Sequence, residues 1–156
     1  MKIQGSVALV TGANRGLGQV YARELVARHA VKVYGAARNP AAVTEPGVTP
    51  VALDITDPDR VAQVAQECAD VSLLVNNAGI LKYSTFIGAP GLDAARAEME
   101  TNYFGTLSMC RAFAPVLADE RTRFVKASLP RDHELIYPPI QELWDSAFKS
   151  PGEDRS

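Results

Sequence analysis

A glycine-rich turn lies between an apolar run and a helical pattern close to the start of the chain. Residues 7–10 read Val-Ala-Leu-Val, as in a strand buried on both faces, and apolar residues three and four apart follow within 17–25. Gly12 permits a tight turn out of the strand. Gly16 and Gly18 leave room for a diphosphate to approach the backbone and for the helix to pack close to the sheet. The N-terminus of the following helix adds unpaired N–H groups and a partial positive charge. The segment therefore predicts an anion site, or else a turn that only permits close packing.

The alternation of apolar runs and helical patterns continues along the first three-quarters of the chain. Further strands are expected at 31–36, 48–53 and 71–75, with one helix starting at Asp57-Pro58 and another over 92–115. Strands separated by helices pair in parallel through right-handed crossovers. The last helix is expected to turn one stripe to the core, formed by Leu92, Ala95, Met99, Tyr103, Thr106, Cys110 and Phe113.

This alternation stops after Leu117. Residues 124–127 are consistent with a weak fifth strand, but a helix is favoured instead. One face of that helix would carry Leu117, Phe124, Val125 and Leu129. Prolines follow, and residues 140–148 then predict a last amphipathic helix. We expect a domain at 1–117 and a helical tail at 118–156, which packs on the domain or serves in oligomerisation.

Composition and charge argue against several classes of protein. The 156 residues carry a net charge of −2, which leaves no electrostatic footprint for nucleic acid or an anionic membrane. No apolar run approaches the ~20 residues of a membrane span, and residues 1–10 are too short and polar for a signal peptide. Cys68 and Cys110 lie on apolar helical faces, and neither they nor the two scattered histidines have metal-ligand spacing. We expect a cytoplasmic protein with reduced cysteines and no metal.

Four short segments follow one another in order within residues 1–117. They are Thr11-Gly12-x-x-x-Gly16-x-Gly18, Leu53-Asp54-Ile55, Asn76-Asn77-Ala78-Gly79 and Thr101-Asn102-Tyr103-Phe104-Gly105. Together they resemble the short-chain dehydrogenase/reductase family. The resemblance implies an α/β fold, a truncated Rossmann-like arrangement of three layers (α/β/α). Its parallel sheet would have about four strands in the order 3-2-1-4, followed by the helical tail.

The resemblance also implies which residues would bind a dinucleotide. In the family, the aspartate of the second segment accepts a hydrogen bond from adenine, and the third segment supports the sheet and lines the adenosine pocket. The candidate cofactor residues are Gly12, Asn14, Arg15, Gly16, Leu17, Gly18, Arg38, Asp54, Ile55, Asn76, Ala78 and Gly79. From the residues alone, Asp54 is also consistent with the capping region of the next helix, and Asn76 and Asn77 with turn residues.

The residues after the second expected strand bear on the choice of cofactor. An NAD site needs a carboxylate there for the ribose 2′-hydroxyl, whereas an NADP site needs positive charge. Ala37 stands where the family's NAD-preferring members carry the acid, and Arg38 follows it. Arg15 resembles the second basic position of the NADP-preferring members. NADP(H) is therefore favoured over NAD(H), the alternative being that both arginines are solvated surface charges.

The catalytic pair that the resemblance implies is absent from this sequence. In the family a tyrosine is the acid and base, a lysine four residues later lowers its pKa, and a serine orients the substrate carbonyl. None of the five tyrosines here has a lysine four residues later. Ser128 matches the serine only if 124–127 is the fifth strand. Asn102 resembles the asparagine of the family's proton relay and is expected to be vestigial here. An internal deletion joining the fourth helix to the tail is the simplest interpretation.

Three functions remain open. A protein that binds NADP(H) without turnover is favoured, because the diphosphate and adenosine contacts are present and the acid and base are not. An active oxidoreductase of carbonyls or secondary alcohols would need an unrecognised acid or base, such as His133 or Tyr137. The third is an oligomerising scaffold with a vestigial site. Since the order 3-2-1-4 leaves 71–75 as an apolar edge, we expect a homo-oligomer through that edge unless the tail covers it.

Overall fold

A parallel five-stranded sheet forms the centre of the computed structural model, which describes residues 3–82, 92–118 and 123–126. The strands are β1(Val7–Thr11), β2(Lys32–Ala37), β3(Val48–Ala52), β4(Leu73–Asn76) and β5(Arg123–Lys126), in the order β3-β2-β1-β4-β5. All four pairings are parallel. The expected order 3-2-1-4 is therefore confirmed, and the sheet continues by one strand beyond it.

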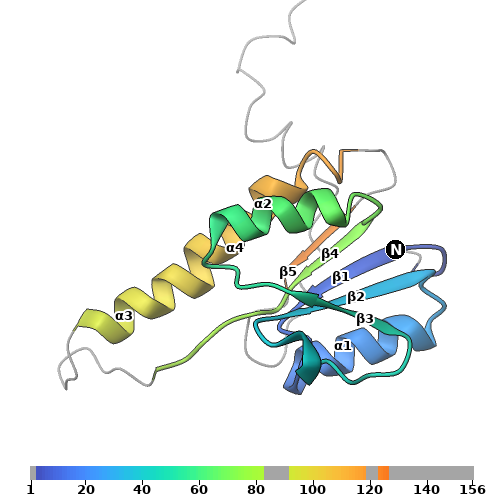
Figure 1. Cartoon of the computed structure of the whole chain (residues 1–156), viewed down its shortest axis with the longest axis horizontal. Coiled ribbons are helices and arrows are strands. Elements are labelled where there is room, and N and C mark those ends of the chain that lie inside the picture. Colours follow the sequence, from blue (N-terminus) through green and yellow to red (C-terminus); the bar gives the residue numbers. More distant parts are fainter. Residues whose placement is uncertain (1–2, 83–91, 119–122, 127–156) are drawn as a thin grey trace, which may run out of the picture.

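Helices cover both faces of this sheet (Figure 1). One face is packed by α1(Gly16–Ala27), and the other by α2(Pro58–Glu67) and α4(Thr106–Phe113), which lie side by side. Each face has its own core. The α1 side buries Ala8, Val10, Ala22, Leu25 and Val33, and the α2 side buries Leu9, Val64, Leu74, Met109 and Phe113. Consecutive residues of β1 thus point to opposite layers, which explains why its sequence is continuously apolar.

The fifth strand corrects the helix that we favoured after Leu117. Residues 123–126 run parallel to β4, with Leu74 opposite Phe124 and Val75 opposite Val125. The free N–H and C=O groups along the edge of β4 gain partners in this way, a tertiary contribution that a helical pattern in the sequence cannot reveal. The sheet therefore extends past the expected boundary at 117, and β4 is not an exposed edge. The expected helix at 140–148 lies outside the described residues.

The long helix is divided into three parts, which corrects its predicted stripe. They are α3(Leu92–Met99), the π-helical turn η2(Glu100–Gly105) and α4. Phe113 is buried as expected, but Met109, which the predicted stripe did not include, is buried too, and the side chains of Met99 and Tyr103 are 52% and 54% exposed. A π-helical turn has more residues than an α-helical turn, so it shifts the direction in which later side chains point. No residue of α3 is buried, and Figure 1 shows this helix projecting past the sheet.

The start of α2 is as predicted. Asp57 precedes the helix, and its Oδ1 accepts hydrogen bonds from Asp59 N at 3.1 Å and Arg60 N at 3.0 Å. Pro58 occupies the first helical position, where no N–H is needed. Val61, Val64 and Ala65 then form the buried face of the helix. Capping and apolar spacing therefore fix this element locally.

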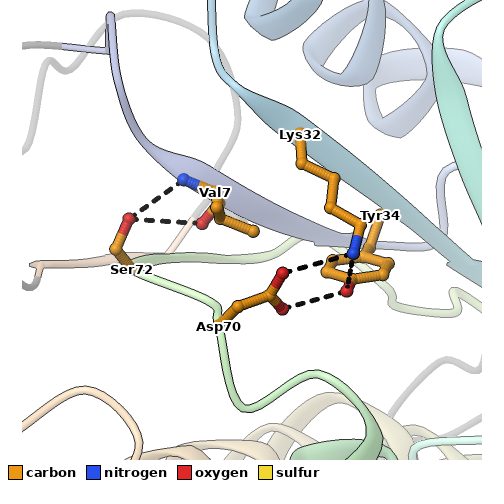
Figure 2. A network of polar contacts seen from close by, with 5 residues as sticks. All are labelled: Val7, Lys32, Tyr34, Asp70 and Ser72. Carbon is orange, nitrogen blue, oxygen red and sulfur yellow. Dashed lines mark hydrogen bonds and ion pairs between the residues drawn. The ribbon is translucent and has the colours of Figure 1, made fainter.

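A polar cluster joins the amino ends of the strands (Figure 2). Tyr34 Oη donates to Asp70 Oδ1 at 2.9 Å, and Lys32 Nζ, which also contacts Tyr34 Oη, lies 3.2 Å from Asp70 Oδ2. Beside it, Ser72 Oγ accepts from Val7 N at 3.0 Å. Burial raises the pKa of the Tyr34 phenol. The cluster ties the α2–β4 connection to β1 and β2, so Tyr34 is a structural residue.

Two kinds of feature are absent from the part of the chain that the structure describes. No helix there is long and apolar enough to cross a lipid bilayer. Nor do three or more His, Cys, Asp or Glu side chains gather there as metal ligands.

Candidate functional site

A cavity of about 570 Å³ opens at the carboxyl ends of the central strands. It lies where the chain order reverses, since β1 is followed outward by β2 on one side and by β4 on the other. Its walls come from the segments after β1, β2, β3 and β4. They include Thr11, Gly12, Asn14, Arg15, Gly16, Ala37, Arg38, Asn39, Leu53, Asp54, Ile55, Asn77, Ala78, Gly79, Ile80, Lys82 and Thr101. The volume is typical of small-molecule sites.

The glycines of the first turn shape one wall of this cavity. Gly12 and Gly16 have φ angles of 69° and 57°, in the left-handed region that favours glycine. A Cβ added at Gly16 would meet no atom within 4 Å, so the backbone there faces open space. A Cβ added at Gly18 would lie 2.2 Å from Gly12 O, so this position requires glycine for the helix to approach the turn. The turn thus keeps bare backbone available to a ligand.

The N-terminus of α1 is open toward an anion. Its N-cap residue, Arg15, makes no side-chain capping bond, and the first turn contains no acidic residue. The first N–H groups of the helix and its partial positive charge are therefore not neutralised locally. Such an arrangement beside a glycine turn suits a phosphate or diphosphate.

Hydrogen bonds of Thr11 and Asn77 connect the turn after β1 to the turn after β4. Thr11 Oγ1 accepts from Asn77 N at 3.0 Å and from Ala78 N at 2.9 Å. In return, Asn77 Nδ2 donates to Thr11 O at 2.9 Å. Thr11 is 1% exposed. These bonds fix the geometry of the two cavity walls. Sequence reasoning did not assign this role to Thr11, whereas the family resemblance implied that the segment of Asn77 supports the sheet.

The side chain of Asp54 belongs to the turn before α2, and Asp54 also lines the cavity. Its Oδ1 accepts from Thr56 N at 3.0 Å and from Thr56 Oγ1 at 2.8 Å, which closes a turn before α2. Oδ2 has no hydrogen-bond partner among the described residues, and Asp54 lines the cavity. Leu53 and Ile55, its buried neighbours, supply apolar surface beside this carboxylate. The arrangement offers an acceptor and a flat apolar wall, as a nucleobase needs.

Arg15 and Arg38 reach the cavity from two different turns. Both are exposed, and neither forms an ion pair with any of the residues that the structure describes. By contrast, Arg60 is held by Glu67, with Nη1 2.7 Å from Oε1. Ala37, at the end of β2, brings no carboxylate to this corner. Two unpaired guanidinium groups here favour a ligand with a further phosphate.

Asn102 stabilises the cavity wall formed by the segment after β4. Its Oδ1 accepts from Ile80 N and its Nδ2 donates to Ile80 O, both at 2.8 Å. Asn102 lies within η2, and its oxygen would lie 3.1 Å from a Cβ added at Gly79. The side chain thus holds the main chain that follows β4.

Three of the candidate cofactor residues do not line the cavity. Leu17 is 63% exposed, and Gly18 is enclosed by Gly12 and Asn77. Asn76 is buried on the α4 side, where its Nδ2 lies 3.4 Å from Cys110 Sγ. The other candidate cofactor residues all contribute to the walls.

Sequence reasoning also missed several lining residues. Asn39, Thr56, Lys82 and Thr101 belong to the walls, although none of them was a candidate. Asn39 and Thr56 directly follow segments that were recognised, so adjacency could have indicated them. Lys82 and Thr101 come together only through the path of the chain after β4.

The described walls of the cavity carry groups that bind anions and accept hydrogen bonds. Among the described residues, the ionisable side chains that line the cavity are Arg15, Arg38, Asp54 and Lys82. No described tyrosine, histidine or cysteine lines it. The walls therefore combine a phosphate site, two further cations and a carboxylate beside apolar surface, which fits a nucleotide with several phosphates.

Comparisons with known proteins agree with this geometry. The sequence profile described as short chain dehydrogenase matches residues 6–127. A short chain dehydrogenase from Burkholderia cenocepacia, solved in complex with NADP, has a TM-score of 0.77 and 44% identity to this chain. That similarity covers 81% of this chain and 54% of the other.

Curated relatives show the same partial overlap. An uncharacterised oxidoreductase of Schizosaccharomyces pombe is 33% identical over 138 residues, which cover 80% of this chain and 54% of the relative. The NADP-dependent 3-hydroxy acid dehydrogenase of that organism is 30% identical over 129 residues, 74% of this chain and 50% of the relative. The chain thus spans about half the length of the curated relatives that it matches.

Proposed function

The chain belongs to the short-chain dehydrogenase/reductase family, and from that premise we propose that its cavity binds NADP(H) in preference to NAD(H). The observation that carries the proposal is the position of Arg15 and Arg38 beside an open helix N-terminus, with no ion-pair partner for either among the described residues. The NADP complex of the Burkholderia relative and the NADP dependence of the fission-yeast relative support it. Ala37, in place of an acid, adds to the same preference.

The residues present fit the cofactor part by part. The bare backbone at Gly16 and the first turn of α1 would hold the diphosphate. Arg15 and Arg38 would hold the 2′-phosphate, and the free oxygen of Asp54 would accept from adenine. When bound, the nicotinamide ring supplies hydride transfer.

We further propose that this chain binds the cofactor without turnover of its own. The sequence contains no tyrosine with a lysine four residues later, and the described cavity walls offer no tyrosine or histidine. Proton transfer to or from a carbonyl oxygen needs such a group within hydrogen-bond reach. A reducing compartment such as the cytoplasm would keep the free cysteines Cys68 and Cys110 as thiols, and we propose that location.

Titration calorimetry of matched variants tests the NADP(H) proposal. NADPH should bind about 10–100 times more tightly than NADH, because charge-assisted bonds to a phosphate are worth about 1.5–3 kcal/mol. Arg38→Ala should remove most of that preference by weakening NADPH alone. Arg23→Ala, an exposed arginine of α1 that does not line the cavity, is the control and should bind like the wild type. Equal affinities of the wild type for NADH and NADPH would refute the preference.

An active oxidoreductase is the second candidate. The fifth strand favours it in one respect. Ser128 would match the family's serine if residues 124–127 formed the fifth strand, and β5 covers residues 123–126. Ser128, His133 and Tyr137 lie outside the described residues. Steady oxidation of NADPH by the purified chain with a panel of small ketones, abolished in a Tyr137→Phe or His133→Ala variant, would establish this function.

A further inference from the structure

The main-chain carbonyl at the end of β3 faces the edge of the described sheet. β3 is the outermost strand on its side, and Leu53 N donates to Ala37 O of β2 at 3.0 Å. Successive residues of a strand direct their main-chain groups to opposite sides, so Ala52 O points away from β2. A carbonyl at such an edge has no partner strand and needs another donor.

A side chain of α2 supplies this donor. Arg60 Nε donates to Ala52 O at 2.8 Å. The main-chain N–H of Arg60 is itself held at the start of α2, where it donates to Asp57 Oδ1 at 3.0 Å. Arg60 therefore connects the first turn of α2 to the last residue of β3.

The guanidinium of Arg60 is also held by a carboxylate two turns further along α2. Nη1 lies 2.7 Å from Glu67 Oε1 and Nη2 lies 3.0 Å from Glu67 Oε2, so the pair is bidentate. Nη1 also donates to Gln63 Oε1 at 3.3 Å. All three nitrogens of the guanidinium thus have acceptors, which fixes the position and the plane of the group.

This contact lies directly before one wall of the nucleotide cavity. Residues 53–55 follow Ala52 and line the cavity, whereas Arg60 and Glu67 do not. The side chains of Arg60 and Glu67 are 27% and 54% exposed, and an exposed ion pair adds little to the stability of a fold. Its effect on geometry is larger, because ligand affinity depends on how exactly the binding groups are held.

We propose that Arg60, held by Glu67, is the positioning residue of the nucleobase subsite and sets its specificity for adenine. By fixing the end of β3, it places the Asp54 carboxylate where the amino group of adenine can donate to it. The inference rests on the proposed binding of NADP(H). Deamino-NADPH is the matched probe, because its hypoxanthine has a carbonyl oxygen in place of that amino group and the rest of the molecule is the same.

Titration calorimetry with both cofactors tests the proposal. The wild type should bind NADPH about tenfold or more tightly than deamino-NADPH, because a hydrogen bond to a charged group is lost in the second ligand. Arg60→Ala should reduce this ratio to about threefold or less, through weaker binding of NADPH alone. Arg60→Lys should behave in the same way, since an ammonium group lacks the planar fork that Glu67 and Ala52 O share.

Two further variants complete the design. Arg60→Ala/Glu67→Ala should bind both cofactors as Arg60→Ala does, because Glu67 acts only through Arg60. Arg28→Ala is the matched control. It removes another exposed guanidinium, at the end of α1, which lies 3.6 Å from Glu24 and does not line the cavity. This control should keep the wild-type ratio.

Hydrogen exchange of the free protein gives a second measure that needs no ligand. The amides of residues 53–56 should exchange about three- to tenfold faster in Arg60→Ala than in the wild type, and as in the wild type in Arg28→Ala. A wild type that binds neither cofactor would refute the proposed function, and this exchange would still decide whether Arg60 holds the wall.

Three results would overturn the inference. Equal weakening of both cofactors by Arg60→Ala, with the ratio unchanged, would mean that Arg60 only stabilises the fold. Unchanged exchange at residues 53–56 would mean that the bond to Ala52 O does not hold this wall. A double variant that binds NADPH more weakly than Arg60→Ala would show that Glu67 does not act through Arg60.

Discussion

Asn102 holds both the N–H and the C=O of Ile80, and so links the helix after Thr101 to the cavity wall. The sequence could identify this asparagine by its place in a motif, but not the main chain that it contacts. That contact depends on the π-helical turn that carries the residue. Thr11 and Asn77 are similar cases, since residues 66 positions apart in the chain meet only in the folded sheet.

Removal of the Asn102 amide should loosen this wall. Asn102→Ala loses two hydrogen bonds that are partly exposed, each worth about 0.5–1 kcal/mol, so NADPH should bind about five- to thirtyfold more weakly. The amide of Ile80 should also exchange faster with solvent. Gln66→Ala, an exposed amide on α2 away from the cavity, is the matched control. Unchanged affinity together with unchanged exchange at Ile80 would show that Asn102 has no such role.

Alkaline pH should destabilise the protein through Cys68. Burial raises the pKa of this thiol from about 9 to about 11, so between those values the unfolded chain releases the proton and the folded chain retains it. Stability is therefore complete below about pH 9 and falls by about 2 kcal/mol as the pH rises through 11. The pKa values of Lys32 and Tyr34 are raised too, through their mutual hydrogen bond and through burial respectively, which adds in the same direction.

Urea unfolding at pH 8 and at several values up to 11 measures this effect. In the Cys68→Ala variant, the free energy of unfolding should fall less steeply at alkaline pH. The decline that remains should be the smaller part due to Tyr34 and Lys32. A variant whose decline matches that of the wild type would exclude the thiol as the cause.

Among the elements, α1 ends at an unusual residue. His29 has a φ angle of 62°, where glycine is common, because Ala30 N and His29 N donate back to Leu25 O and Val26 O and close the helix. A side chain in this conformation costs about 1 kcal/mol.

Glycine at this helix end should stabilise the fold. His29→Gly should raise the free energy of unfolding by about 0.5–1 kcal/mol, which corresponds to a few degrees in Tm. His29→Ala keeps the Cβ and is the control, so it should show no such gain. If thermal unfolding shifts equally in both variants, the backbone strain is not the cause.

The elements also show where sequence patterns succeed and where they fail. The apolar runs of β1 and β4 and the cap and stripe of α2 are local patterns, so local residues determine these elements. The fifth strand is short and gains its structure from pairing with β4, so its helical pattern was misleading. The stripe predicted for 92–113 fails in two places: α3 projects past the sheet with no buried residue, and the wider turn of η2 shifts the direction of the side chains after it.

For the molecule as a whole, the site was easier to predict than its surroundings. The glycine turn, Asp54 and the two arginines lie directly after strands, so a parallel sheet brings them together at its carboxyl edge whatever the details. Lys82 and Thr101 join them through a long connection, whose course no local pattern determines. Alternate residues of β1 likewise point into the two cores, so the sequence of this strand indicates both cores.

The central claim is that the turn after β1, together with the segments after β2, β3 and β4, forms a working nucleotide site. Amide hydrogen exchange with and without NADPH tests it most directly, because it reports both binding and its location. We predict slower exchange on adding NADPH at residues 12–18, 36–39, 53–56 and 77–80, and no change at the polar cluster around Asp70. A folded chain that shows no slowing in these four segments at millimolar NADPH would contradict the account.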